Sequence, residues 1–412
     1  MLYKCTISLC GKFNMNTDKS ISGLIKNYKY GYSLEQAFYK SQEIYDREIE
    51  NIFLKNWILA GHTSQIPNPG DYFLFEFDKE SIIITRTKKD EVKALINVCR
   101  HRGSHVCLNK EGNTTAFTCP YHAWSYDLEG TLIAARIMSN DFEKSENGLH
   151  QAHVELVGGQ IYISLAEEPL SLKGMQEDLA DVFDQYGFDH MKLVEQRTYP
   201  IEANWKLAVE NYQECYHCAP SHLDYAKIHA LALAPKKFQP MKDKFLKENT
   251  SNIRTKASPY YFDLAKEGDE GYQYDRNPLL KGIKSGSRDG KPVAPLLGKV
   301  NEYGNGASEF SVGPTTYYLI YDDHMVGFRF LPTSLNTCIA DVFWFVRGDA
   351  IKGKDYDLEE LLWLWHVTIL DDEKIIIDNK KGVDSHFYAP GKLSEMEMME
   401  QHFLNWYLKA LS

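Results

Sequence analysis

Two short segments that each contain one Cys and one His constrain this 412-residue chain more than any other feature. Cys99-Arg-His101 is followed, after 17 residues, by Cys119-Pro-Tyr-His122. Thiolate and imidazole side chains bind either Zn²⁺ or an iron–sulfur cluster that has two Cys and two His ligands. A zinc finger usually takes its Cys ligands from one segment and its His ligands from another, whereas here each segment supplies one of each. The spacing therefore favours the cluster, with a structural zinc site as the alternative.

The residues around this motif predict a small all-β domain. Prolines and a glycine at 67–70 indicate a turn, and apolar runs at 73–77, 81–86 and 92–98 are typical of short antiparallel strands. A further strand pattern lies near Ile161. We expect the domain to span residues 55–165, and residues 1–54 to form an N-terminal extension and a helix that packs on the second domain.

The remaining residues, 166–412, predict an α+β domain. Helical patterns occur at 171–187, from Trp205, at 357–381 and at 395–411, and strand patterns at 190–203, 315–323, 325–332 and 338–348. The stretch 235–310 is rich in Lys, Gly, Pro, Asp and Asn, so we expect it to form loops and lid segments. The expected architecture is an antiparallel sheet with helices on one side.

A second group of candidate metal ligands lies in this domain. Pro220 ends the helix that contains His217, so His222 can turn back toward it. Two imidazoles and one carboxylate form the ligand set of non-haem Fe(II) oxygenases, although two core or surface histidines are the ordinary alternative. Asp372 lies on an apolar stripe of its helix, where a carboxylate is costly unless it is paired or bound to metal. Asp371 faces elsewhere and fits a solvated acid.

The segments CRHRG (99–103) and CPYHAWSYDLEG (119–130) resemble the Rieske domain of ring-hydroxylating oxygenase large (alpha) subunits. The resemblance extends from about residue 33 to the C-terminus, and ENYQECYHC (210–218) is closest in look to the branch that acts on betaine-like quaternary amines. It implies an all-β domain with a [2Fe–2S] cluster and a catalytic domain of the helix-grip (START-like) fold with a mononuclear Fe(II). Ala123 stands where the family usually has Gly, and Lys380 where it usually has Gln.

This resemblance also implies a role for each candidate residue. The cluster ligands would be Cys99, His101, Cys119 and His122. The iron ligands would be His217, His222 and Asp372, because the family pattern places Gly ten residues after the acid, as Gly382 is here. Glu214 resembles the acid that joins the two metal sites of neighbouring subunits in a homotrimer, through His217 of its own chain and His122 of the next.

The implied function is that of the terminal oxygenase component of a multicomponent Rieske oxygenase. Electrons would come from a flavin/iron–sulfur reductase, with or without a ferredoxin, and O₂ would be used to hydroxylate or oxidatively demethylate a small organic substrate. An aromatic-ring or natural-product hydroxylase or dioxygenase of the same family is the alternative. An electron carrier without oxygenase activity would explain residues 55–165 but not His217, His222 and Asp372. No G-x-G-x-x-G fingerprint occurs, so nicotinamide and flavin chemistry would belong to the partner protein.

Composition excludes other classes of partner. The net charge of −11 argues against nucleic acids and anionic membranes, which need a basic surface. No apolar segment is long enough to span a membrane, so the expected location is cytoplasmic. The eight cysteines are expected to be thiols or metal ligands, with Cys107 a buried thiol and Cys215 and Cys218 small packing residues. The first 14 residues are interpreted as either a dispensable extension or the result of a misplaced start codon, since Met15 begins a more ordinary polar start.

Overall fold

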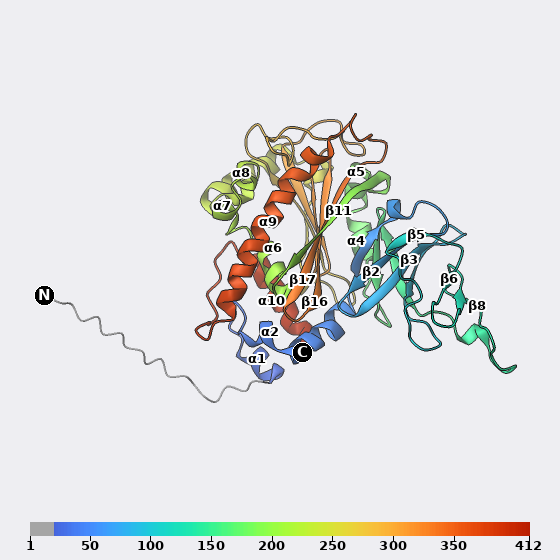
Figure 1. Ribbon diagram of the computed structural model, residues 1–412. Helices are drawn as coiled ribbons and strands as arrows, with labels where there is room; N and C mark the ends of the chain where they lie inside the picture. Colours follow the sequence, from blue (N-terminus) through green and yellow to red (C-terminus); the bar gives the residue numbers. More distant parts are fainter. Residues whose placement is uncertain (1–19) are drawn as a thin grey trace.

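The computed structural model describes residues 20–412 (Figure 1). The extension interpreted at the first 14 residues, with Cys5 and Cys10, lies outside these residues. The described chain begins with helical segments that pack beside the C-terminal helix, namely α1 (Ile21–Asn27), α2 (Ala37–Lys40), α3 (Gln42–Glu48) and the π-helical turn η1 (Ile49–Phe53). The hydroxyl of Ser41 caps α3 by accepting a hydrogen bond from the Ile44 N–H.

Antiparallel strands form the next part of the chain, as predicted. A seven-stranded sheet has the order β1-β10-β9-β4-β3-β2-β5, and a three-stranded sheet, β6-β7-β8, lies at its tip. The strands of the larger sheet are β1 (Ile58–His62), β2 (Asp71–Phe77), β3 (Glu80–Arg86), β4 (Val92–Ile96), β5 (Glu111–Asn113), β9 (Gln151–Val157) and β10 (Gln160–Ser164). Those of the smaller sheet are β6 (Phe117–Thr118), β7 (Ser125–Tyr126) and β8 (Leu132–Ala134).

A second seven-stranded antiparallel sheet, ordered β11-β17-β16-β15-β14-β13-β12, forms the centre of the α+β domain. Its strands are β11 (Met191–Ile201), β12 (Ser258–Tyr260), β13 (Tyr272–Pro278), β14 (Gly306–Val312), β15 (Thr316–Ile320), β16 (Met325–Ser334) and β17 (Thr337–Arg347). The helices are α4 (Lys173–Asp178), α5 (Ala180–Tyr186), α6 (Trp205–Tyr212), α7 (Cys218–Ser221), α8 (Pro235–Glu248), α9 (Leu358–Val383) and α10 (Met398–Leu411). Short 3-10 turns occur at Thr63–Gln65, Lys144–Glu146, Phe188–His190, Tyr225–Lys227, Ala230–Ala232, Ile253–Thr255 and Phe262–Leu264.

The prediction that 235–310 forms only loops and lids was wrong. This stretch contains α8 and three strands of the sheet. Its polar composition misled the prediction because several of its charged residues are buried as ion pairs. Lys242 on α8 binds Asp275 at 2.7 Å, and Arg276 binds Asp322 at 2.8 Å.

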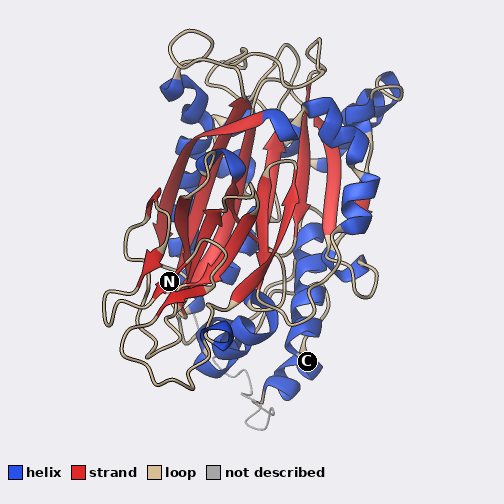
Figure 2. Ribbon diagram, turned by 90° about the vertical axis from the view of Figure 1, so that its right-hand side faces the viewer, coloured by secondary structure: helices blue, strands red, loops and turns tan. Residues whose placement is uncertain are grey.

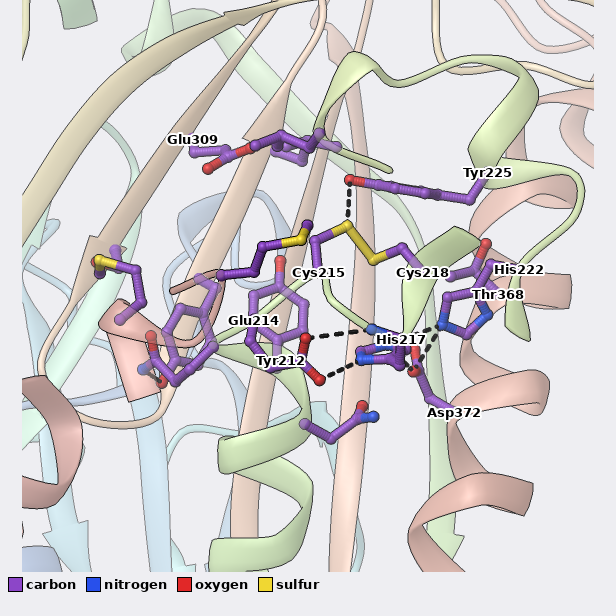
Figure 3. Close-up of a pocket in the computed structure, with 18 of the residues that line it drawn as sticks. Tyr212, Glu214, Cys215, His217, Cys218, His222, Tyr225, Glu309, Thr368 and Asp372 are labelled. Carbon is purple, nitrogen blue, oxygen red and sulfur yellow. Dashed lines mark hydrogen bonds and ion pairs between the residues drawn. A yellow bond between two sulfur atoms is a disulfide. The ribbon is translucent and has the colours of Figure 1, made fainter. Parts of the chain in front are cut away.

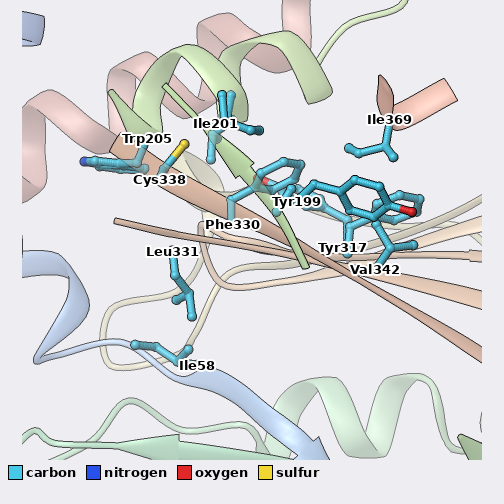
Figure 4. Close-up of a cluster of buried hydrophobic side chains, with 14 of the residues drawn as sticks. Ile58, Tyr199, Ile201, Trp205, Tyr317, Phe330, Leu331, Cys338, Val342 and Ile369 are labelled. Carbon is cyan, nitrogen blue, oxygen red and sulfur yellow. The ribbon is translucent and has the colours of Figure 1, made fainter. Parts of the chain in front are cut away.

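Both faces of the catalytic sheet are covered (Figure 2), rather than one as expected. On one face α6 and α9 pack against side chains such as Tyr317, Phe330 and Val342 (Figure 4). On the other face α5 and strands β1 and β10 of the first domain pack against Tyr318 and Phe343. The polar active-site residues described below lie on the first of these faces.

The two domains are joined through main-chain contacts. The Arg329 guanidinium on β16 donates to the carbonyl oxygens of Leu59 and Ala60 on β1, at 2.6 and 2.9 Å, and is held by the Asp341 carboxylate at 2.6 Å. This attachment leaves β6–β8 at the opposite end of the molecule from α7 and α9 (Figure 1). None of the helices in residues 20–412 is long and apolar enough to cross a membrane.

Candidate metal centres

The two Cys-and-His segments fold into loops with the same backbone hydrogen bonds. The Cys99 N–H donates to the Ser104 carbonyl, and the Cys119 N–H donates to the Trp124 carbonyl, both at 2.8 Å. Both cysteine side chains are buried. The loops therefore hold their thiols in equivalent positions although their His spacings differ by one residue.

A second backbone hydrogen bond, in which the cysteine carbonyl is the acceptor, closes each loop. The Gly103 N–H donates to the Cys99 carbonyl at 2.9 Å, and the Ala123 N–H donates to the Cys119 carbonyl at 3.1 Å. The φ angles are 79° at Gly103 and 58° at Ala123. Ala123 thus occupies the left-handed region, where a Cβ atom costs roughly 1 kcal/mol relative to glycine.

The two histidines of these loops approach each other at the surface. The Nδ1 atoms of His101 and His122 are 3.1 Å apart, and the Tyr121 ring stacks on His122 with a centroid distance of 3.9 Å. The Tyr126 hydroxyl lies 3.4 Å from the Cys99 sulfur. Two buried thiols and two facing Nδ1 atoms are the donor set that a Rieske cluster requires, so these residues fit that group.

The second group of candidate ligands comes from two separate parts of the chain. Helix α6 ends at Tyr212, earlier than predicted, and a turn leads into the short α7, which His222 follows. The Nε2 atoms of His217 and His222 are 3.1 Å apart, and the Asp372 Oδ1 on α9 lies 3.4 and 3.0 Å from them. The structure thus brings together the three residues that the sequence proposed (Figure 3).

The electrostatics of this group favour a bound cation. Burial opposes a charge on His217, but its hydrogen bonds to the Asp372 and Glu214 carboxylates outweigh this effect and raise the pKa of His217 to about 9. Burial likewise raises the pKa of Asp372, but contacts with His217 and His222 lower it below its usual value. Two ring nitrogens and a carboxylate oxygen converge on one point, which is the ligand set of a 2-His-1-carboxylate metal site. These residues therefore fit a mononuclear iron.

Asp371 and Asp372 have different surroundings, as expected. The Asp371 side chain is half exposed, and its Oδ2 lies 3.5 Å from the Nδ1 atom of His222, on the far side of the ring from Asp372. That Nδ1 makes no hydrogen bond in the described structure. Asp371 is therefore near a candidate ligand but does not point into the centre.

Glu214 contacts His217 as predicted, but its second oxygen is also engaged. Its Oε1 lies 2.5 Å from the His217 Nδ1. Its Oε2 accepts hydrogen bonds from the backbone N–H groups of Tyr216 and His217. Oε2 thus already accepts two hydrogen bonds, so the lone pair that remains for a further donor is on Oε1.

Cys215 and Cys218, predicted to be separate thiols, form a disulfide on either side of His217. The turn between α6 and α7 brings their Cα atoms to 4.9 Å, within the range that a disulfide bridges. The sequence analysis treated both cysteines as thiols because a cytoplasmic location was expected, and it did not consider this local geometry. The remaining described cysteines, including Cys107 as predicted, are free and buried.

A cavity of about 380 Å³ opens beside the three candidate ligands. Its walls combine aromatic rings with acidic groups, and Figure 3 shows Tyr212, Tyr225 and Glu309 on its lining. Sequence analysis missed Glu309, although an acid within the strand pattern of β14 was a usable signal. Glu210 on α6 is buried, accepts a hydrogen bond from the Tyr39 hydroxyl at 2.9 Å, and has a pKa that burial raises to about 8.

Comparison with known proteins agrees with this geometry. The family model of the Rieske [2Fe-2S] domain matches residues 56–150, and that of the ring hydroxylating alpha subunit (catalytic domain) matches residues 188–412. The chain belongs to the Rieske-type ring-hydroxylating oxygenase alpha subunits. Such subunits carry a Rieske cluster and a mononuclear iron, so a zinc site and a cluster-only electron carrier are both excluded.

Individual relatives cover this oxygenase chain to different extents. The glycine betaine monooxygenase oxygenase subunit of Pseudomonas aeruginosa is 33% identical over 95% of this chain and 92% of its own. The carnitine monooxygenase oxygenase subunit of Escherichia coli is 36% identical over 48% of this chain and 54% of its own. The structure of a quaternary ammonium Rieske monooxygenase, CntA, superposes with a TM-score of 0.71 over 94% of this chain and 98% of that one, at 22% identity.

This chain is therefore the terminal oxygenase component of a multicomponent enzyme. It is an oxidoreductase that uses O₂ and electrons from a separate reductase. The helix-covered antiparallel sheet and the all-β Rieske domain confirm the predicted fold class.

Proposed function

We propose that this oxygenase subunit removes an N-methyl group from a small quaternary amine. The observation that carries the proposal is the cavity beside His217, His222 and Asp372, whose walls are aromatic and acidic. Aromatic faces and carboxylates attract a trimethylammonium group, which has no N–H to donate. The full-length likeness to a glycine betaine monooxygenase oxygenase subunit supports the same class of substrate.

In this proposal the two metal groups have separate protein ligands. Cys99 and Cys119 would hold one iron of the cluster, and His101 and His122 the other. His217, His222 and Asp372 would hold the mononuclear iron and leave positions open toward the cavity. When bound, the cluster supplies electron relay and the iron supplies O₂ activation.

The overall reaction fixes what the protein residues must do. A methyl group on nitrogen, O₂, two electrons and two protons give an N-hydroxymethyl group and water. The hydroxymethyl group then leaves as formaldehyde, and the proton of its hydroxyl remains on the tertiary amine. Tyr212, Tyr225 and Trp365 would orient the substrate and exclude bulk water, because their aromatic rings line the cavity.

We also propose that three copies of the chain form a ring, in which Glu214 links its own His217 to His122 of a neighbour. Within one chain the cluster loops and α7 lie at opposite ends of the molecule (Figure 1). Apolar side chains are exposed beside both sites, Tyr121 and Ile137 near the cluster loops and Tyr216 next to Glu214. Burial of both patches between subunits would bring the two sites together.

We also propose that the chain is divided as predicted from the sequence, into an N-terminal segment (1–54), a Rieske domain (55–165) and a catalytic domain (166–412). The N-terminal segment packs on the catalytic domain through contacts such as that of Phe38 with Tyr407, whose ring centroids are 6.0 Å apart. The reductase would be a flavin and iron–sulfur protein, acting directly or through a ferredoxin.

The proposed function is tested by reconstituting the oxygenase with a flavin-dependent reductase and measuring substrate-dependent O₂ uptake and formaldehyde. A panel of quaternary amines is compared with benzoate and anthranilate, which represent aromatic substrates. We expect formaldehyde in proportion to O₂ with at least one quaternary amine. Turnover of the aromatic acids alone, with no formaldehyde from any amine, would show that the substrate class is wrong.

A further inference from the structure

Apart from the candidate iron ligands His217 and His222, the charged side chains that line the cavity are all acidic. Four acids contribute to its walls, namely Glu214, Glu309, Asp372 and Glu395. No Lys or Arg occurs among the described residues that line it, and its only histidines are the two candidate iron ligands. The cavity thus attracts a cation, but it offers a ligand's carboxylate no cationic side chain with which to pair.

Two acids of this lining, Glu309 on β14 and Glu395 before α10, are outside the ion pairs of the described structure, and Glu309 is the one within the sheet. Asp372 and Glu214 are engaged with the two histidines, whereas Glu309 makes no ion pair among residues 20–412. Its strand neighbour is Asp275 on β13, and the Lys242 ammonium is bound to Asp275 at 2.7 and 2.8 Å instead. Burial and the neighbouring Asp275 raise the pKa of Glu309 to about 7, whereas Lys242 and a hydrogen bond with Asn277 act in the opposite direction, so a cation in the cavity would favour the carboxylate form of Glu309.

Two aromatic residues, Tyr212 and Tyr225, line the cavity together with Glu309 and the candidate iron ligands. Burial raises the pKa of Tyr212 and Tyr225, and the carboxylates of Glu309 and Asp372 raise both further, so each hydroxyl lies in the field of both acids. Tyr317 packs on Tyr212 with a centroid distance of 4.5 Å. A trimethylammonium group held against these rings would have Glu309 on one side and the iron ligands on the other (Figure 3).

We propose that Glu309 is a specificity-determining residue that binds the cationic head of the substrate, and that the substrate is a quaternary amine without a carboxylate. This inference rests on the proposed function and narrows it. Glycine betaine and carnitine, which the relatives named above oxidise, both carry a carboxylate. The described lining of this cavity gives such a group an acidic wall and no Lys or Arg with which to pair, so a ligand of net charge +1 is the better match.

The test measures binding to the holoenzyme without O₂, so that turnover plays no part. Three probes of similar shape differ in charge: choline is a cation, glycine betaine a zwitterion, and 3,3-dimethylbutan-1-ol a neutral analogue of choline. Calorimetric titration should show choline binding at least about tenfold more tightly than either of the others. Glu309→Gln should weaken choline binding by about 10- to 100-fold, the range for loss of a charged partner in a buried site.

The neutral alcohol provides an internal control, because its affinity should change less than about threefold in Glu309→Gln. Ser311→Ala is the matched variant: Ser311 lies on the same strand and lines the same cavity without a charge. It should affect choline and the neutral alcohol equally. Equal weakening of both probes by Glu309→Gln would overturn the proposed role.

Two further results would separate this inference from the proposed function. If glycine betaine binds as tightly as choline, the inference that the substrate lacks a carboxylate is wrong. The proposal that the substrate is a quaternary amine would still stand. If none of the three probes binds and no quaternary amine yields formaldehyde, the proposed function fails and this inference with it.

Discussion

The carboxylate of Glu48 is the strongest candidate for a single-residue effect on stability. It accepts hydrogen bonds from the Lys206 ammonium at 2.6 Å, the Trp205 indole at 2.7 Å and the Tyr407 hydroxyl at 2.5 Å. Both Glu48 and Lys206 are fully buried. The carboxylate therefore joins α3, α6 and α10, and α6 is the helix that leads to the candidate iron ligands.

Glu48→Ala should reduce the free energy of unfolding by about 3–5 kcal/mol, because it leaves an uncompensated ammonium group in the core. An ordinary neutral hydrogen bond would contribute only about 1 kcal/mol. The exposed pair of Lys173 and Glu177, 3.5 Å apart, provides the control. Glu177→Ala should cost no more than about 0.5 kcal/mol.

The measurement is urea unfolding of the holoenzyme, followed by tryptophan fluorescence. Glu48→Ala should lower the midpoint of the transition that involves the catalytic domain by about 1–2 M, given a urea dependence of up to about 3 kcal/mol per M. The double variant Glu48→Leu/Lys206→Met should recover most of this loss, because an apolar pair of similar size often replaces a buried ion pair without cost.

The pH dependence distinguishes a buried charge from lost packing. Burial lowers the pKa of Lys206, and Glu48 opposes this effect. Without Glu48, burial favours the neutral amine of Lys206 in the folded protein. In the unfolded chain the same side chain stays protonated up to about pH 10.4. The unfolded state then binds more protons, so stability rises with pH by up to about 1.4 kcal/mol per pH unit. The deficit of Glu48→Ala relative to wild type should shrink between pH 7 and pH 9. A pH-independent deficit, or one no larger than that of Glu177→Ala, would refute the reasoning.

Three further predictions concern the metal centres. Cys119→Ser should abolish the Rieske EPR signal of the reduced protein; a wild-type protein with stoichiometric zinc and no acid-labile sulfide would contradict this site. Asp372→Ala should remove mononuclear iron and turnover but keep the cluster spectrum, while Asp371→Ala should retain most of the iron, measured by metal analysis; the reverse ranking would exchange their roles. Glu214→Gln should keep both metals and the trimer but slow oxidation of the reduced cluster by at least about tenfold in single turnover with substrate and O₂, because a charge-assisted bond is lost; an unchanged rate would argue against the inter-subunit route.

The sequence was most informative where neighbouring residues determine the outcome. The strands β2, β3 and β4 follow from apolar runs of five to seven residues, and the two cluster loops follow from Cys and His spacing. Asp372 could be proposed as a ligand from its own helix alone, because a carboxylate on an apolar helical stripe needs a partner. Each of these signals is contained within a single element of the chain.

Features that depend on contacts between distant segments could not be derived in this way. Lys242 made the sequence of α8 look solvent-exposed, because its ion-pair partner Asp275 lies on another element and is not evident from the local sequence. The acidic character of the cavity depends on Glu309 facing the same space as the candidate iron ligands, which only the folded sheet shows. The Cys215–Cys218 bond was missed for a different reason, since the backbone turn, not the residue types, brings the sulfurs together.

The contact of Arg329 with β1 places an unequal constraint on the two domains during evolution. The Rieske side of this contact consists of the carbonyl oxygens of Leu59 and Ala60, which every amino acid possesses. Substitutions at these two positions can therefore accumulate without removing the hydrogen bonds, provided that the strand keeps its path. On the catalytic side, both Arg329 and its Asp341 partner must be kept, because loss of either leaves the other charge buried. Sequence drift at this junction should thus be tolerated on one side and restricted on the other.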